Sequence, residues 1–144
     1  MQKQVSEQQI VQMAQIEEAL LASKKDFLRK VYNILADSER TIASLKELTK
    51  TPEKMYMNLG SGVLLEVEAK NTKTCKRAFA ENGYLEEEIN ETLKWLDKKR
   101  DNAQTQIARI KQDISSSDAK LNELVGVLKQ IEAQKQKEFN ISKK

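Results

Sequence analysis

Apolar residues in the C-terminal part of the chain recur at every fourth and third position in alternation. The series runs through Ile89, Leu93, Leu96, Arg100, Ala103, Ile107, Ile110, Ile114, Ser117, Leu121, Leu124, Leu128 and Ile131. A repeat of about 3.5 residues that persists over this length is typical of a left-handed coiled coil rather than of a globular helix. We therefore predict a coiled-coil helix over residues 86–138, followed by a flexible tail over 139–144. The helix opens with Glu86–Glu88, whose negative charge favours a helix N-terminus.

The N-terminal part of the chain carries two apolar stripes at helical spacing instead of one. The first stripe comprises Ile10, Met13, Glu17, Leu20, Lys24, Phe27, Val31, Ile34, Ser38, Thr41, Leu45 and Leu48. The second lies beside it and comprises Val11, Ala14, Leu21, Leu28, Tyr32, Leu35 and Ile42. Together they predict a coiled-coil helix over residues 1–51 with an apolar face wider than a two-helix seam requires. The helix should end just before Pro52, because the residue preceding a proline avoids helical backbone angles.

Charged residues at or beside these stripes indicate how the two helices pair. If the helices run antiparallel, one register brings opposite charges together where the apolar seam is interrupted and apolar residues together elsewhere. Exposed pairs of this kind contribute only a few tenths of a kcal/mol, roughly, so they select a register more than they stabilise it. The predicted facing pairs are Glu17–Lys120, Lys24–Asp113, Asp37–Arg100 and Phe27–Ile110.

Between the helices, residues 52–85 have the composition of a small β-structure. This island holds three of the four glycines of the chain. Two segments rich in strand-forming residues, Met55–Leu59 and Val63–Ala69, flank the turn sequence Gly60-Ser61-Gly62, which predicts a first hairpin. A second hairpin is predicted from Cys75–Ala80 and Tyr84–Glu86. The predicted fold is therefore mainly α: a long antiparallel two-helix coiled coil with a small island of two β-hairpins between the helices.

Short hairpins of this kind point to assembly with other chains. Two strands of about five residues are only marginally stable alone, and their edges carry unpaired backbone groups. The economical explanation is that the strands pair with strands of other subunits, so that the island is an assembly module. The residues that we expect at this contact are Met55, Met57, Leu59, Val63, Leu65, Val67, Phe79 and Tyr84.

Composition argues against an enzyme and against several kinds of partner. The chain has no histidine, which removes the commonest general base and histidine metal ligands, and we predict no catalytic, cofactor-binding or metal site. A net charge of +3 arises from interleaved acidic and basic residues, which is typical of solvated helix faces rather than of nucleic-acid binding. No apolar run of membrane-spanning length and no secretory signal are apparent. With the single Cys75, these features predict a cytoplasmic protein that binds no nucleic acid and no membrane.

Two sequence stretches resemble the α-type subunits of prefoldin. The first is MYMNLGSGVLLEV, residues 55–67, which is similar to the first hairpin of that family. The second is NGYLE, residues 82–86, followed by Ile89 and Leu93, which resembles the passage into the second helix of the family. Two hairpins are typical of α-type subunits, since β-type subunits have one. The third strand departs from the family pattern, because Lys76 and Arg77 stand where apolar residues are usual, and the sequence leaves its burial open.

The resemblance implies a molecular chaperone without nucleotide or other cofactor. Its partners would be other α-type and β-type prefoldin subunits in a hetero-hexamer. Its clients would be non-native cytoskeletal proteins such as actin and tubulin, delivered to the cytosolic chaperonin. Clients would bind at the ends of the coiled coil, where the chain offers Val5, Ile10, Val11, Met13, Leu124, Val127, Leu128, Ile131, Phe139 and Ile141.

Two other interpretations remain open from the sequence. The terminal apolar residues also suit a simpler role, in which they only close the coiled coil. The chain as a whole also suits a structural scaffold subunit of a prefoldin-like co-chaperone complex, in which the helices dock fixed partners.

Overall fold

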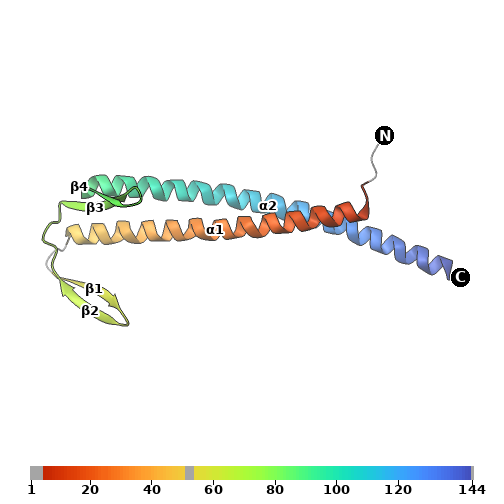
Figure 1. The fold of residues 1–144 in the computed structure, drawn as a ribbon, viewed down its shortest axis with the longest axis horizontal. Coiled ribbons are helices and arrows are strands. Elements are labelled where there is room, and N and C mark those ends of the chain that lie inside the picture. Colours follow the sequence, from red (N-terminus) through yellow and green to blue (C-terminus); the bar gives the residue numbers. More distant parts are fainter. Residues whose placement is uncertain (1–4, 51–53, 144) are drawn as a thin grey trace. The chain divides into compact units, whose positions relative to one another are not determined.

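The structure is a computed structural model that describes residues 5–50 and 54–143 (Figure 1). Two long antiparallel helices in contact make up most of it, with two β-hairpins between them, which confirms the predicted mainly-α fold. None of the helices in the described ranges is long and apolar enough to cross a membrane. The elements in chain order are α1 (Glu7–Lys50), β1 (Met55–Gly60), β2 (Val63–Val67), β3 (Thr74–Phe79), β4 (Gly83–Glu88) and α2 (Ile89–Ser142).

Local sequence signals set both ends of α1. At its start the backbone N–H of Gln9 donates to Ser6 Oγ at 3.3 Å, and the N–H of Ser6 donates to Gln9 Oε1 at 2.9 Å. This reciprocal capping box satisfies amide groups that have no partner within the helix. The helix ends at Lys50, as predicted; Pro52, the residue on which that prediction depends, lies outside the described residues.

The seam between the helices confirms the prediction for α2 and corrects it for α1. On α2 the buried positions follow the predicted repeat, among them Ile89, Leu96 and Ala103. On α1 the seam takes members of both predicted stripes in alternation, while five members of the first stripe are exposed: Met13, Leu20, Phe27, Ile34 and Thr41. The buried or half-buried positions of α1 are Ile10, Ala14, Glu17, Leu21, Lys24, Leu28, Val31, Leu35, Ser38, Ile42, Leu45 and Leu48.

The chain divides into two compact units, of which the first, the terminal unit, comprises residues 1–31 and 106–144. In it the N-terminal part of α1 lies beside the C-terminal part of α2 (Figure 1). Glu7 and Lys135 form an ion pair, and Lys120 Nζ lies 3.4 Å from Glu17 Oε2. Lys24 Nζ donates a hydrogen bond to Ser117 Oγ at 2.7 Å.

These contacts confirm one of the three predicted charge pairs, Glu17–Lys120. Lys24 binds Ser117 instead of Asp113. Arg100 forms ion pairs with its neighbours Asp97 and Asp101 on α2, at 3.4 and 3.5 Å, instead of with Asp37. An arginine with acidic residues one and three positions away satisfies its charge within its own helix, so it does not need a partner on the facing helix.

The second unit, the hairpin unit, comprises residues 32–105 and holds two separate two-stranded antiparallel sheets. In the first, Met57 pairs with Leu65 and Gly60 with Val63. Its turn needs left-handed backbone angles, with φ of 52° at Ser61 and 78° at Gly62, and Gly60 has φ of 101° beside a bulge. Glycine adopts such angles without steric cost, so the Gly-Ser-Gly sequence explains the turn.

The second sheet corrects the predicted start of α2. Its strand β4 runs to Glu88, so the three glutamates that were expected to open the helix lie in a strand. Each of these glutamates lies opposite a residue of β3: Glu86 lies opposite Lys76, and Glu87 lies opposite Cys75. Basic residues on β3 offset the acidic run, and α2 begins at Ile89, whose N–H donates to Lys73 O at 2.9 Å.

The far end of α2 also differs from the prediction. The helix continues to Ser142, whereas the sequence predicted that it would end at Glu138. Phe139 and Ile141 therefore lie on a helix rather than on a tail.

Candidate functional site

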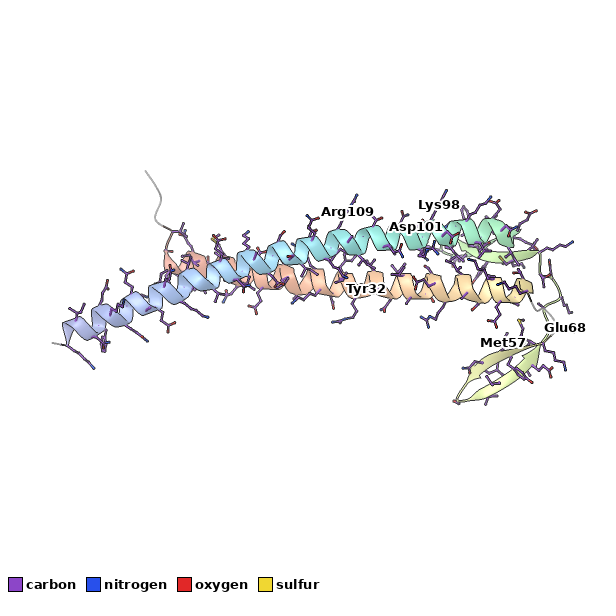
Figure 2. The ribbon with its side chains drawn as sticks, turned by 180° about the vertical axis from the view of Figure 1, so that it is seen from behind. Tyr32, Met57, Glu68, Lys98, Asp101 and Arg109 are labelled. Carbon is purple, nitrogen blue, oxygen red and sulfur yellow. The ribbon has the colours of Figure 1, made fainter. Side chains whose placement is uncertain are left out.

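Both hairpins expose large apolar side chains. We call this set the hairpin surface: Tyr56, Met57, Leu59, Val63, Leu64, Leu65, Phe79, Tyr84 and Leu85. Tyr84 is 74% exposed, and Met57 extends from β1 in Figure 2. Isolated apolar residues on a surface are ordinary, but a concentration on two short hairpins marks a surface that another protein covers.

Most residues predicted for subunit assembly belong to this surface. Met55 and Val67, the first and last of the predicted set along the first hairpin, are half-buried instead. Three members of the surface, Tyr56, Leu64 and Leu85, were not predicted. Leu64 lies on the same face of β2 as Glu66, yet consecutive apolar residues such as Leu64 and Leu65 indicate a strand that is covered on both faces.

The polar third strand is held against α2 by a hydrogen-bonded network. Arg77 Nε donates to Glu87 Oε1 at 2.6 Å, and Thr92 Oγ1 donates to the same oxygen at 2.8 Å. The Cys75 thiol lies 3.1 Å from Thr92 Oγ1, and the Arg77 guanidinium stacks over the Trp95 ring at 4.5 Å. Arg77 and Glu87 are each more than four-fifths buried as side chains. Within this chain, Arg77 therefore faces the helix as one half of an ion pair, whereas its neighbour Lys76 is exposed.

The same contacts shift the ionisation of both partners. Hydrogen bonds from Arg77 and then from Thr92 lower the pKa of Glu87, because they stabilise its carboxylate form. The hydrogen bond to Glu87 in turn raises the pKa of Arg77. The pair therefore stays charged around neutral pH and fixes β3 and β4 on the first turns of α2.

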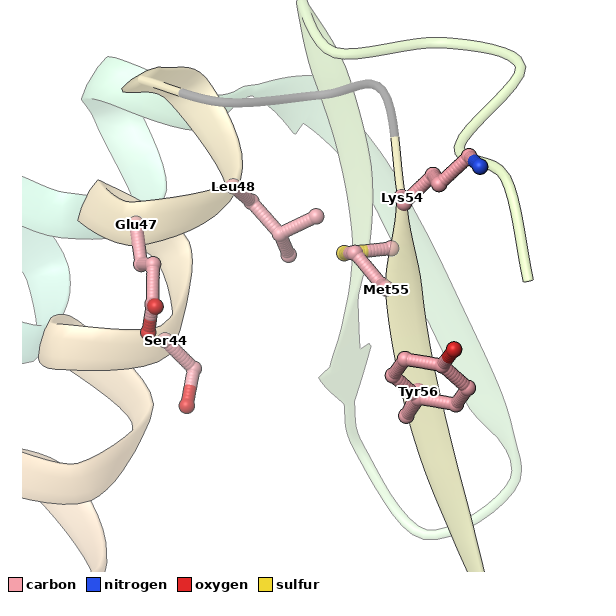
Figure 3. A pocket seen from close by; sticks show the side chains of 6 residues that line it. All are labelled: Ser44, Glu47, Leu48, Lys54, Met55 and Tyr56. Carbon is pink, nitrogen blue, oxygen red and sulfur yellow. The ribbon is translucent and has the colours of Figure 1, made fainter. Parts of the chain in front are cut away.

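A groove of about 370 Å³ separates the end of α1 from β1 (Figure 3). Leu48 and Met55 point toward each other across it, and Tyr56 lies beside Met55 (Figure 3). Ser44, Glu47 and Lys54 supply its polar lining. The groove is open and has mixed polarity, which suits contact with a protein chain better than enclosure of a small ligand.

The residues predicted to bind clients fall into two groups. Ile10 is buried, and Leu124, Leu128 and Ile131 are half-buried on the seam side of α2. The remainder are exposed, and we call them the tip surface: Val5, Val11, Met13, Val127, Phe139 and Ile141. All of them belong to the terminal unit, as do both chain ends. The structure thus separates residues available to a partner from residues that close the coiled coil.

Glu17 is a charged residue buried in the seam of the terminal unit. A hydrogen bond with Ser117 is the main factor that lowers its pKa below the usual glutamate value of 4.5, and Lys120 adds to the effect. Burial opposes this shift, but the net result favours the ionised form. The carboxylate is therefore a structural group that holds α1 in register.

Metal chemistry finds no support among the residues that the structure describes. Within residues 5–50 and 54–143, no three side chains of His, Cys, Asp or Glu come together in a way that could hold a metal ion. The hairpin surface and the tip surface are the candidate functional features of the described residues.

Comparisons with known proteins agree with this architecture. A family model described as "Prefoldin subunit" matches residues 14–137. Among solved structures, the chain is similar to one described as a cryo-EM structure of filamentous PFD from Methanocaldococcus jannaschii, with a TM-score of 0.65 and 19% sequence identity. That match covers 80% of this chain and 97% of the other, and at this identity it shows a shared fold. No curated protein matches the chain.

Proposed function

Because the chain belongs to the prefoldin subunit family, whose members are non-enzymatic chaperones that assemble with other prefoldin subunits, we propose that it is an α-type subunit of a hetero-hexameric, ATP-independent chaperone. Family membership confirms the resemblance predicted from the hairpin sequences. The presence of two hairpins supports the α-type assignment. The proposed assembly contains two α-type and four β-type chains.

The observation that carries the assembly proposal is the hairpin surface. Each sheet has only two strands, so its outer edges present backbone groups that strands of neighbouring subunits can bind. Apolar residues on both faces of β2 favour a position between other layers of protein rather than at a solvent boundary. Burying them contributes roughly 25 cal/mol per Å² of apolar surface removed from water, and this favours assembly.

The tip surface supports the client proposal. Exposed Met, Val, Ile and Phe side chains suit weak binding to many apolar sequences. We propose that this surface captures non-native proteins of cytoskeletal type, such as actin and tubulin, in the cytoplasm and that the assembly delivers them to the chaperonin.

The test is the native mass and activity of the complex that the chain forms. Co-expression with β-type prefoldin subunits should give a hetero-hexamer by native mass spectrometry, and this complex should suppress aggregation of denatured actin without ATP. A monomer or plain homodimer under these conditions contradicts the assembly proposal. A hexamer that leaves actin aggregation unchanged would instead favour the structural scaffold.

A further inference from the structure

The terminal unit has a second coiled-coil seam on α1, which α2 leaves exposed. We call it the outer seam: Met13, Ile16, Leu20, Ser23 and Phe27. Its members are separated alternately by three and four residues, the spacing at which one helix packs against another. Four of the five are large and apolar, and Ser23 is small enough to let a second helix approach closely. All of them are exposed, and Ile16 reaches 62%.

The outer seam is continuous with the interface between α1 and α2. Residues three and four positions apart are neighbours on a helix surface, so Leu20 lies beside Glu17 and Lys24 of the inner seam. Both charges are already engaged with α2: Glu17 with Lys120, and Lys24 with Ser117. A third helix placed on the outer seam therefore meets apolar side chains and charges that already have partners along this border.

The solvent border of the outer seam is similarly poor in free charge. On that side Ile16 and Ser23 are neighbours of Gln12, Ala19 and Asp26. Asp26 forms an ion pair with Arg29 at 3.3 Å, within the same helix. A strongly charged partner helix therefore finds no unpaired opposite charge among these neighbours. A helix with an apolar stripe flanked by neutral or mixed residues fits this border better.

The length of the outer seam limits what can occupy it. The same spacing leads to Gln9 on one side and Lys30 on the other, so the apolar stretch ends at a polar residue in both directions. It is about two heptads long, and Ser23 interrupts it. Permanent coiled coils usually sustain at least about three heptads. A stable interface usually uses roughly 20–30 residues on each side. The seam is therefore too small to hold a second copy of the chain permanently and suits a transient helical partner.

We propose that the outer seam binds amphipathic helical segments of non-native proteins by coiled-coil packing, in preference to extended segments. This inference rests on the proposed chaperone function and specifies the class of segment that the chaperone selects. A helix with apolar residues at the same three-and-four spacing places its side chains between those of the outer seam. An extended segment presents apolar residues at every second position and matches only part of the series.

Two synthetic peptides provide a direct probe. The first is a fluorescent peptide of about three heptads, with leucine at the seam positions and alanine, glutamine, glutamate and lysine elsewhere. The second has the same sequence except for two central prolines, which break the helix. Binding of each to the complex purified after co-expression with β-type subunits is measured by fluorescence anisotropy. We expect the helical peptide to bind at least about tenfold more tightly.

A matched pair of variants assigns that preference to the outer seam. The test variant is Ile16→Gln/Leu20→Gln/Phe27→Gln, because glutamine is a good helix former and these side chains are exposed. The control is Val125→Gln, which removes an exposed apolar residue outside both the outer seam and the tip surface. Circular dichroism and the unfolding midpoint should match the unchanged chain for both. The test variant should lose the tenfold preference, and the control should keep it.

Three results would overturn the inference. The first is equal binding of the two peptides to the unchanged complex. The second is equal helix preference in the test and control variants. The third is a change in subunit number on sedimentation of the test variant, which would make the seam an interface between chains. Suppression of actin aggregation, measured on the same samples, separates this inference from the proposed function. If the complex suppresses aggregation but shows no preference for the helical peptide, only this inference fails. If the complex does not suppress aggregation, the proposed function fails as well.

Discussion

Polar residues inside an apolar seam fix the alignment of the two helices in the terminal unit. Glu17 and Lys24 occupy seam positions of α1, and each finds its partner on α2, Lys120 and Ser117 respectively. If every layer of the seam were apolar, one helix could shift by a heptad along the other, because each leucine would be replaced by an equivalent leucine. A buried carboxylate opposes this shift, since it would lose its hydrogen bonds without regaining water. At the residue scale, these positions specify the register at some expense in apolar burial.

The ionisation of Glu17 gives a pH-dependent prediction. Its pKa is lower in the folded chain than in the unfolded chain, so the folded state is favoured above the unfolded pKa and loses this contribution as pH falls through the folded pKa. We expect Glu17→Gln to lower the unfolding temperature at about pH 7 and to lower it less at about pH 3, because protonation of the carboxylate removes its contribution as pH falls. Thermal unfolding followed by circular dichroism measures the difference.

Glu18→Gln is the matched control, because Glu18 is adjacent and exposed. It should leave the unfolding temperature nearly unchanged at both pH values. An effect of Glu17→Gln that is independent of pH would show that its carboxylate charge does not stabilise the seam.

At the scale of elements, α1 is a helix with two apolar faces. The inner seam faces α2, and the outer seam remains exposed beside it. Neighbouring leucines show the contrast: Leu21 is 7% exposed, and Leu20 is 48% exposed. The sequence presents both as members of apolar stripes, so it indicates the width of the face but not which positions α2 covers.

Substitution of these two leucines tests the assignment. Leu21→Ala should lower the free energy of unfolding by roughly 2–5 kcal/mol, because it leaves a cavity in the seam. Leu20→Ala should change it by less than about 0.5 kcal/mol, because the side chain is largely in water already. Urea unfolding of both variants measures the two values, and similar losses would place Leu20 in the seam.

The β3–β4 hairpin shows how a tertiary contact overrides a local signal. Three consecutive glutamates before an apolar repeat are typical of a helix start, yet they continue β4. The ion pair between Arg77 and Glu87 and the stacking of Arg77 on Trp95 stabilise the extended conformation of β4. Arg77 lies far enough from Glu87 in the sequence that only the hairpin brings them together.

At the scale of the whole molecule, the chain carries more apolar surface on its hairpins than a solitary protein tolerates well. Subunits of the prefoldin family assemble with one another, and the hairpin surface is the part of this chain that is suited to that contact. Met57 and Leu65 are directly paired across β1 and β2, and both are exposed.

Replacing that pair should separate assembly from folding. We expect Met57→Ser/Leu65→Ser to retain the helical content of the chain, because neither side chain supports the helices. Loss of two apolar side chains that the proposed assembly would bury, worth roughly 1.5–3 kcal/mol each, should weaken subunit association by at least about 100-fold. Light scattering after co-expression with partner subunits measures the loss.

Lys76→Ser is the control on the other hairpin, where the side chain is exposed and polar. It should assemble as the unchanged chain does. If the double variant also assembles normally, the β1–β2 face does not contribute to the interface.

The sequence by itself determined the helices, the hairpins and the family. Periodicity, turn glycines and the restriction that a proline places on the preceding residue act over a few positions, so α2's repeat, the Gly60-Ser61-Gly62 turn and the end of α1 could all be predicted. It also indicated that the apolar face of α1 is too wide for one partner. Tertiary structure decided which residues of that face are buried, which residue Lys24 contacts, and why Arg77 is covered. Each depends on the distance between side chains remote in sequence, and local pattern does not encode that distance.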